Sequence, residues 1–400
     1  MHAVTVLQRV AAPVFRQIHA ARARALLNAV SAHLQGRRLV LMDLARSWPG
    51  AERVRNPLKA LDRLLGNPHL LREKQALYGA MAKWLLKQPR PIIVIDWSDL
   101  QVHRKKFLLR AAVPVKGQTM TVFEAVYEQN EKQKPHVEHE FLRRLRSIMP
   151  PGVRPIIVTD AGFRRPWFRA VRKLGWDFVG RVPGGTYTRW GTGNPMQQAQ
   201  ALFAQATAAP QCFEYAGLGT RDVMRCNLVL YKKPKCGPTS TPHQGLCFRG
   251  RRHRKSEKRE RGAWVLASSL PGNEFSGRAI VKIYTQRMQI EKSFRDLKCV
   301  RHGCAFDHSL TRSCARLAIL LLIHALASFV AWLKGVTLDE REATLKHGGI
   351  LAPRVRRHYS LLRLGWEALR RCDTDIARSS LHDALRHWRQ WARERPAYPT

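Results

Sequence analysis

The stretch AIVKIYTQRMQIEKSFRDLK, residues 279–298, is the segment around which the rest of the chain is organised. It contains neither glycine nor proline, so nothing in its composition interrupts a helix. On a helix of about 3.6 residues per turn, one narrow polar stripe consists of Tyr284, Arg287, Glu291 and Lys298. The stripe beside it is apolar and consists of Ile283, Ile290, Phe294 and Leu297. We therefore expect one continuous helix from Ala279 to Lys298, with the polar stripe half sheltered at the edge of the core.

The composition of this polar stripe favours a functional site. An ordinary i,i+4 pair, such as Arg287 with Glu291, would explain any single contact on a solvated helix. Four such residues in register are better explained by a carboxylate that binds a metal ion and neighbours that bind phosphates. This interpretation requires partner carboxylates elsewhere in the chain.

The charge of the chain indicates a polyanionic partner. Lys and Arg number 70 against 29 Asp and Glu, which gives a formal net charge of +41 over 400 residues. The hydrophobic fraction of 45% is ordinary for a folded protein, so disorder does not explain the charge. Nucleic acid is the natural partner for such a surface. Because acidic residues are scarce, a carboxylate at the end of an apolar run is informative.

The cysteines and the apolar segments indicate a cytoplasmic protein without a membrane span. The eight cysteines form no CxxC pair, so reduced thiols are expected in preference to a zinc site built from Cys226, Cys236, Cys247 and His243. The N-terminus carries no secretory signal. Leu317 to Leu333 is strongly apolar but about one turn short of a comfortable span, and we expect a buried helix there.

Residues 1–88 read as a helical domain. Short helices are expected at Ala20–Leu34, Leu39–Trp48 and Asn56–Leu65, separated by Gly and Pro. With the net positive charge, this pattern favours a DNA-binding domain of helix-turn-helix type. A plain helical packing domain would show the same spacing and remains an alternative.

Residues 89–335 read as a catalytic α/β domain. Buried strands are expected at Pro91–Ile95 and Pro155–Thr159, each followed by an aspartate, Asp96 and Asp160. The other expected elements are strands at Lys106–Val115, Thr119–Tyr127, Trp176–Val182 and Trp264–Ser269 and helices at Pro135–Met149 and Arg165–Leu174. Three antiparallel strands, a helix and then strand-helix-strand is the order of an RNase H-like α/β core.

Two further regions complete the predicted organisation. A β-rich insertion is expected at about 183–263, with a strand at Asn227–Tyr231, and it ends in the basic run Arg249–Arg261. That run is either a solvated loop or an arm that contacts phosphates. Residues 336–400 are expected to be helical and to offer a dimerisation surface.

Asp96, Asp160 and Glu291 form a candidate metal site. Open α/β sheets place their sites at the carboxyl ends of strands, where both aspartates are expected. Three carboxylates suit two divalent ions about 4 Å apart that cleave a phosphodiester, and Mg²⁺ prefers such hard oxygen ligands. A strand-end aspartate that caps a turn is the simpler reading of each one alone. Asp99 competes for the role of Asp96 but is expected beyond the strand end.

The spacing Tyr284-x2-Arg287-x3-Glu291-x6-Lys298 resembles the Y-R-E-K signature of DDE transposases of the bacterial insertion sequence four family. VIDWSD around Asp96 and VTDAGFRRPWF around Asp160 are most similar to the transposase of insertion sequence ten. LDRLLGN at 61–67 and WVLASSLP from Trp264 share this similarity. The resemblance covers nearly the whole chain and is weakest in the insertion and the tail.

The resemblance implies a set of roles. Asp96, Asp160 and Glu291 would bind Mg²⁺, or Mn²⁺ in its place. The residues that would contact DNA are Tyr284, Arg287, Lys298, Arg181 and Trp264, with Trp264 stacking on a flipped base. Members of this family cut DNA by hydrolysis, form a hairpin at the transposon end, reopen it and join the ends to target DNA. The partners implied are the terminal inverted repeats, target DNA and a second protomer in the synaptic complex.

Two alternatives stay open at this point. An RNase H-like nuclease or resolvase without strand transfer would need the three carboxylates but leaves Tyr284, Arg287 and Lys298 unexplained. A catalytically silent DNA-binding relative would be favoured by loss of a carboxylate, and none is lost.

Overall fold

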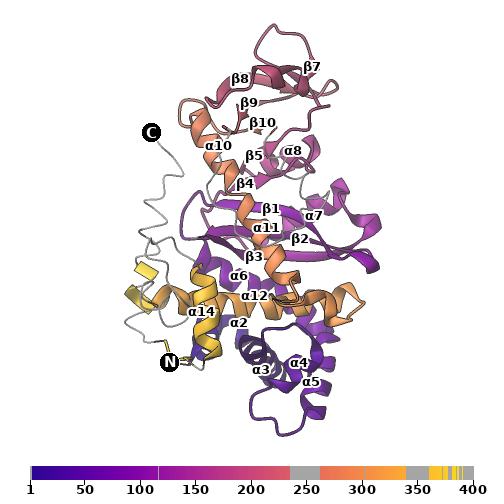
Figure 1. Ribbon diagram of the computed structural model, residues 1–400, viewed down its shortest axis with the longest axis vertical. Coiled ribbons are helices and arrows are strands. Elements are labelled where there is room, and N and C mark those ends of the chain that lie inside the picture. Colours follow the sequence, from indigo (N-terminus) through magenta and orange to yellow (C-terminus); the bar gives the residue numbers. More distant parts are fainter. Residues whose placement is uncertain are drawn as a thin grey trace, which may run out of the picture. The chain divides into compact units, whose positions relative to one another are not determined.

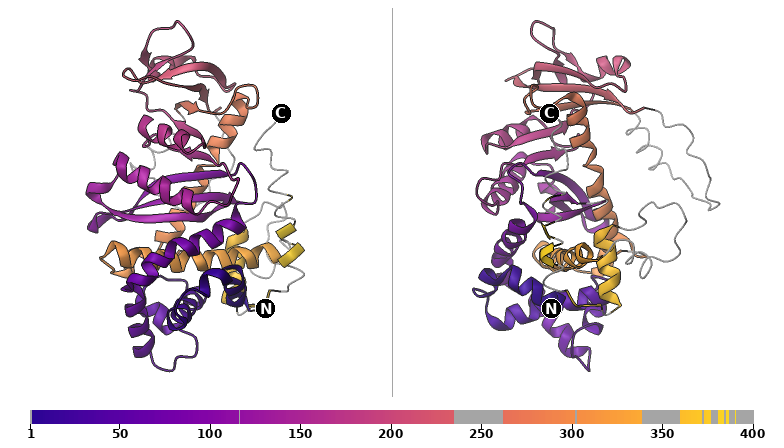
Figure 2. Two further views of the ribbon diagram at one scale, coloured as in Figure 1. Left: turned by 180° about the vertical axis from the view of Figure 1, so that it is seen from behind. Right: turned by 90° about the vertical axis from the view of Figure 1, so that its left-hand side faces the viewer.

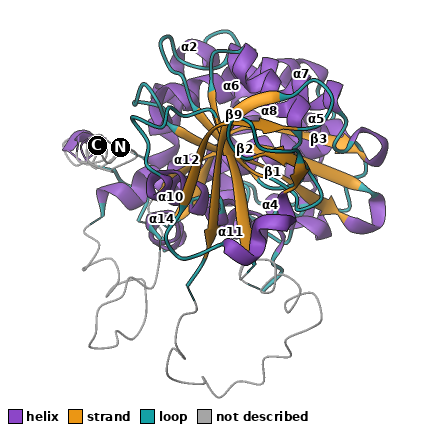
Figure 3. Ribbon diagram, turned by 90° about the horizontal axis from the view of Figure 1, so that it is seen from above, coloured by secondary structure: helices purple, strands orange, loops and turns teal. Residues whose placement is uncertain are grey.

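The computed structural model describes residues 2–115, 117–234, 262–301, 303–338, 360–371, 373–376, 381–383, 385–386 and 390. The basic run at 249–261 and three members of the zinc alternative, Cys236, His243 and Cys247, lie outside these residues, as does most of the tail after residue 338. The chain forms two compact units. Unit 1 consists of Met1–Pro155 and Met288–Arg395, and unit 2 is Ile156–Arg287 in the described part. Both units combine helices and strands (Figure 3).

The N-terminal part of unit 1 is helical, as predicted. Its helices are α1 (Ala3–Val10), α2 (Ala12–Phe15), α3 (Ala20–Gly36), α4 (Leu41–Arg46), α5 (Arg55–Leu65) and α6 (Pro68–Leu85). The start of α6 shows why α5 and α6 are separate helices. The Asn67 side chain accepts hydrogen bonds from the backbone N–H groups of His69 and Leu70, and Pro68 occupies the first helical position.

Three antiparallel strands follow, in the order β3-β2-β1: β1 (Ile92–Gln101), β2 (Lys106–Val115) and β3 (Gln118–Glu128). Helix α7 (Pro135–Ser147) comes next, so the predicted order of elements is confirmed. The prediction that Asp96 ends its strand is wrong. The apolar run stops at Ile95, but backbone pairing with β2 continues to Gln101, so both Asp96 and Asp99 lie inside β1.

Helix α12 (Cys314–Thr337) forms the centre of unit 1. It packs against β3 on one side and against α3 and α5 on another, and α14 (Leu361–Arg370) crosses it (Figures 1 and 2). The helix is longer than the sequence predicts and, by length and composition, could cross a membrane. Most of its apolar stretch is nevertheless buried in unit 1, as expected of a core helix.

Unit 2 is built on the strand-helix-strand element β4 (Ile156–Thr159), α8 (Arg165–Lys173) and β5 (Asp177–Arg181), with β4 and β5 parallel. Its sheet has the order β4-β5-β10-β9-β8-β6-β7. The remaining strands are β6 (Tyr187–Arg189), β7 (Gln197–Gln198), β8 (Gln211–Leu218), β9 (Met224–Lys232) and β10 (Ala263–Ser268). The predicted insertion is therefore rich in strands, and it extends the sheet through β10, which pairs antiparallel with both β5 and β9.

The signature segment is not one continuous helix, which corrects the prediction. It forms α10 (Gly277–Thr285) and α11 (Met288–Lys298), with a turn at Gln286 and Arg287. In this turn the N–H groups of Gln286 and Arg287 bond to carbonyls three residues back, so the last turn of α10 is tightened. The break coincides with the boundary between the units. The apolar stripe is buried as predicted, at Ile283, Ile290, Phe294 and Leu297.

The crossing of α12 and α14 depends on two glycines. A Cβ on Gly365 would lie 1.7 Å from the carbonyl oxygen of Ala331, and a Cβ on Gly335 would lie 1.9 Å from that of Leu361. We expect Gly365→Ala to lower the free energy of unfolding by about 1–3 kcal/mol, because the helices must move apart. Thermal and urea unfolding followed by circular dichroism would measure this change.

Gly79→Ala in α6 is the matched control. Its Cβ would meet Ile148 at 3.6–4.0 Å, which is ordinary contact, so alanine should leave stability unchanged or raise it by up to about 1 kcal/mol. Equal losses in the two variants would contradict the close crossing.

Candidate active site

Asp160 directly follows β4, as the sequence predicts, and is half-buried. Its Oδ1 accepts a hydrogen bond of 2.8 Å from the backbone N–H of Gly162, which fixes the orientation of the carboxylate. Among the described residues this carboxylate has no ion pair with Lys or Arg. The turn-capping role and a ligand role are compatible, because the hydrogen bond engages only one oxygen.

Tyr284 is the centre of a cluster in unit 2 that we call the Tyr284 cluster: Asp160, Arg181, Trp264, Tyr284 and Arg287. The phenol is 3% exposed, and burial raises its pKa above the ordinary value. The charges of Arg287 and Arg181 lower this pKa, the charge of Asp160 raises it, and the Arg287 guanidinium hydrogen-bonds to the phenol. Two cations and one carboxylate thus surround one buried hydroxyl.

Trp264 joins this cluster through its ring. Its centroid lies 5.1 Å from that of Tyr284 in an edge-on arrangement, and the Arg181 guanidinium carbon is 5.9 Å from the indole centroid. Tyr231 packs on it at 5.6 Å, and the side chain is 5% exposed. In this structure Trp264 is a core residue of unit 2.

Asp96 lies in unit 1 and is 8% exposed. Side chains alternate along a strand, so Asp96 and Ser98 share one face of β1, while Trp97 lies on the other and donates to Glu138 of α7. Helix α11 packs on β1 and carries Lys298, whose Nζ donates to Ser98 Oγ at 2.8 Å. This contact places Lys298 beside β1, the strand that carries Asp96.

The charge of Lys298 is tuned by its surroundings. Burial lowers the pKa of its ammonium, and the nearby carboxylates of Asp99 and Asp307 act in the opposite direction. Asp99 itself is exposed and accepts from Lys132 Nζ at 2.9 Å, so it is engaged in an ion pair on the surface. This pairing favours Asp96 over Asp99 as the metal ligand.

Glu291 lies in the first turn of α11 and is exposed. The helix that carries it is fixed by a polar contact two residues further on, where the guanidinium of Arg110 donates to Ser293 Oγ at 3.2 Å. Ser293 also donates to the carbonyl of Ile290 at 2.7 Å. The position of Glu291 in unit 1 therefore depends on Arg110 of β2.

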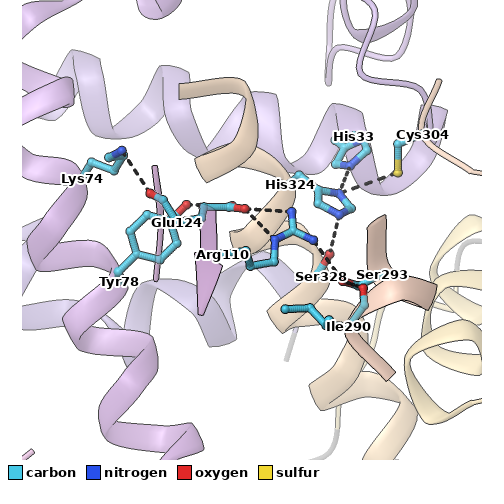
Figure 4. Close-up of polar contacts among 10 residues, drawn as sticks. All are labelled: His33, Lys74, Tyr78, Arg110, Glu124, Ile290, Ser293, Cys304, His324 and Ser328. Atoms are coloured by element: carbon cyan, nitrogen blue, oxygen red, sulfur yellow. Dashed lines mark hydrogen bonds and ion pairs between the residues drawn. The ribbon is translucent and has the colours of Figure 1, made fainter. Parts of the chain in front are cut away.

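Arg110 belongs to a buried network that sequence reasoning missed (Figure 4). It pairs in register with Asp96 on β1 and with Glu124 on β3. Its Nε and Nη2 both lie 2.8 Å from Glu124 Oε2, and both side chains are 1% exposed. Tyr78 donates to the other carboxylate oxygen at 3.0 Å, and burial raises the pKa of that phenol well above its ordinary value.

The structure thus divides the predicted site residues between the units. Unit 2 brings together the Tyr284 cluster. Unit 1 places Asp96 on β1 and both Glu291 and Lys298 on α11, which packs on that strand. A divalent ion fits the chemistry of these groups, because carboxylate oxygens are the hard ligands that it prefers. Asp160 is also held in one orientation by Gly162 and forms no ion pair with Lys or Arg among the described residues.

Glu124→Gln tests the buried network. The substitution leaves the Arg110 charge without its counter-ion, and removing one member of a buried pair costs about 3–5 kcal/mol. We expect the free energy of unfolding, measured in urea, to fall by about this amount.

Glu128→Gln is the control on the same two strands, because Glu128 pairs with Lys106 at an exposed position of the hairpin. An exposed pair contributes about 0–1 kcal/mol, so this variant should remain close to the wild type. A Glu124→Gln variant as stable as Glu128→Gln would show that α11 does not depend on the network.

Comparison with known proteins identifies the family of the chain. Residues 87–330, more than half of the chain, match the family described as Transposase DDE domain. No curated protein matches the sequence. The matched segment contains all eight residues predicted for the site and both halves of the Y-R-E-K signature. The chain therefore belongs to the DDE transposase family, whose members act on DNA and generally use divalent metal ions.

Proposed function

We propose that this protein is a cut-and-paste transposase of the insertion sequence four family, similar to the transposase of insertion sequence ten. One observation carries the proposal: in each unit, one half of the signature lies beside one strand aspartate. In unit 2 the charge of Asp160 acts on the Tyr284 phenol, which is hydrogen-bonded to Arg287. Lys298 bonds to β1 two residues beyond Asp96 in unit 1.

The domain organisation that we propose is the one predicted from the sequence. Residues 1–88 form a DNA-binding domain, 89–335 an RNase H-like catalytic domain and 336–400 a region that supports a dimer on paired DNA ends. The net charge of +41 supports binding to both transposon ends and target DNA. The protein would act in the bacterial cytoplasm, on the nucleoid.

Asp96, Asp160 and Glu291 are the proposed ligands of Mg²⁺. When bound, such ions favour deprotonation of the attacking water or hydroxyl and stabilise the leaving oxygen. The carboxylates hold the site, and Gly162 keeps Asp160 oriented through its backbone N–H. Glu291 is carried by α11, which packs on the strands of unit 1.

The basic and aromatic residues are proposed to hold DNA. Arg287, Arg181 and Lys298 bind phosphates of the transposon end, and Tyr284 orients Arg287 through their hydrogen bond. Water first cleaves one strand and frees a 3′-hydroxyl, which attacks the opposite strand to form the hairpin. Trp264 would stack on the flipped base, which requires its ring to leave the contacts with Tyr231 and Tyr284.

The proposal predicts a hairpin product. Purified protein, Mg²⁺ and a labelled duplex that carries the element's own terminal repeat should give a hairpin on a denaturing gel. Asp160→Asn and Glu291→Gln should abolish both nicking and hairpin formation while end binding persists, because each removes a proposed metal ligand. Asp296→Asn removes a carboxylate from the same helix outside the site and should cut at the wild-type rate.

The outcomes separate the candidate functions. Nicks without hairpin or joining would favour a nuclease that performs no strand transfer. Binding without any cleavage by the wild type would favour a silent DNA-binding relative. Normal cleavage by Glu291→Gln would remove Glu291 from the site.

A second prediction concerns phosphate binding. Arg287→Ala should weaken binding to the terminal repeat and reduce the slope of log Kd against log salt by about 1, the change expected for one lost phosphate contact. Arg278→Ala, an exposed arginine on α10, is the matched control and should change affinity less. Equal effects of the two variants would mean that Arg287 contributes only bulk charge.

A further inference from the structure

Unit 1 contains a second group of metal-binding side chains, distinct from the carboxylates. His33 of α3, His324 of α12 and Cys304 of the loop after α11 place their ligand atoms within 4.8 Å of one another (Figure 4). No other group of three or more such side chains meets this limit among the described residues. We call these three residues the His-Cys-His cluster.

The distances within the cluster suit a tetrahedral metal site. His33 Nε2 lies 3.1 Å from His324 Nδ1, and Cys304 Sγ lies 3.7 Å from the same nitrogen. Zinc bonds of about 2.0–2.1 Å to nitrogen and 2.3 Å to sulfur place neighbouring ligand atoms roughly 3.3–3.6 Å apart. The contact between the two imidazoles is therefore one that a zinc ion could replace with small shifts.

The surroundings of His324 allow the tautomer that a metal ligand requires. Its Nε2 lies 3.5 Å from Ser328 Oγ, the hydroxyl one helical turn further along α12. A proton on Nε2 leaves Nδ1 with the lone pair that faces the cluster, which is the usual arrangement of a metal-binding histidine and its outer partner. Burial lowers the pKa of His33 to about 3 and that of His324 well below its ordinary value, so both rings are neutral near pH 7.

Cys304 is held rigidly beside the two histidines. Its N–H bonds to the carbonyl of Asp296 on α11 at 2.9 Å, and its carbonyl accepts from Leu39 at 2.8 Å. Gly303 allows this approach, because a Cβ there would lie 2.0 Å from the Asp296 carbonyl oxygen. A loop fixed to the end of α11 thus presents the thiol toward helices distant in sequence.

The surroundings of the cluster distinguish between metals. Burial raises the pKa of the Cys304 thiol to about 12, while the charges of Arg37, Arg370 and Arg110 act to lower it and that of Asp296 raises it. The same guanidinium groups repel a cation that is held by charge alone, which disfavours Mg²⁺. A metal with a strong preference for nitrogen and sulfur overcomes this repulsion, and zinc has that preference.

A fourth position is accessible. Cys304, His324 and Ser328 line a cavity of about 80 Å³, which is large enough for water. We propose that His33 Nε2, His324 Nδ1 and Cys304 Sγ bind one Zn²⁺ ion, with a water molecule from this cavity as the fourth ligand. The thiol proton passes to solvent when the metal binds, and no electron transfer occurs. The bound ion links α3, α12 and the loop that follows the Glu291 helix.

Cobalt substitution tests this site directly. Full-length protein freed of metal with a chelator is titrated with Co²⁺, and absorption spectra are recorded. We expect one equivalent to give the sulfur-to-cobalt charge-transfer band of a thiolate ligand, and one equivalent of Zn²⁺ to displace it. Zn²⁺ should also raise the Tm of the metal-free protein, because it binds only the folded cluster.

Variants identify the ligands. Cys304→Ser and His33→Gln should lose the stoichiometric band and the rise in Tm, with circular dichroism spectra in chelator unchanged from the wild type. Cys226→Ser alters another buried cysteine, one that belongs to the zinc site imagined from sequence alone, and should keep both. The absence of the band in the wild type, or its loss in Cys226→Ser and retention in Cys304→Ser, would overturn the proposal.

This proposal is independent of transposition. Asp160→Asn should retain the cobalt band although it loses DNA cleavage. The cobalt titration reports the zinc site and the cleavage gel reports transposase activity. A failure of one proposal is therefore distinguishable from a failure of the other.

Discussion

The buried ion pair of Arg110 and Glu124 is the interaction on which the architecture of unit 1 depends. It joins β2 to β3, and a further nitrogen of the guanidinium donates a hydrogen bond to Ser293 of α11. An ion pair at 1% exposure gains little over an apolar pair in free energy, but it is costly to break and it specifies register and orientation. Helix α11 is therefore positioned by a directional contact as well as by its apolar face.

The Arg110–Glu124 ion pair also constrains where residues of the predicted site lie. Asp96, Arg110 and Glu124 lie opposite one another across three strands, so the register that buries the ion pair also sets the place of Asp96. On that side of β1, Lys298 reaches Ser98. In unit 2 the Tyr284 phenol performs a comparable task, since it is buried and bound by Arg287 near Asp160. Two buried polar centres thus orient residues of the predicted site.

Much of this organisation is predictable from sequence. Apolar runs and turn residues locate the strands and helices within a few residues, since backbone pairing and burial follow the same patterns. The break at Gln286 and Arg287 could not be predicted, because it involves no glycine or proline and coincides with a boundary between compact units. The end of β1 was missed because pairing with β2 continues through polar residues.

Other features leave a signal that is recognisable only in retrospect. Arg110 and Glu124 are single charges within apolar strands of one hairpin, and a shift of register between Ala111 and Ala112 places them opposite each other. The His-Cys-His cluster leaves no such signal, because its histidines are 291 residues apart and its cysteine belongs to no CxxC pair. Tertiary packing alone brings them together.

We propose that Asp96, Asp160 and Glu291 share one divalent-metal site. Anomalous diffraction from crystals of the protein with its terminal DNA, grown in Mn²⁺, would test this proposal. We expect anomalous peaks coordinated by oxygens of all three carboxylates and of a DNA phosphate. Peaks bound by other side chains, with Asp160 or Glu291 turned away from the metal, would contradict it.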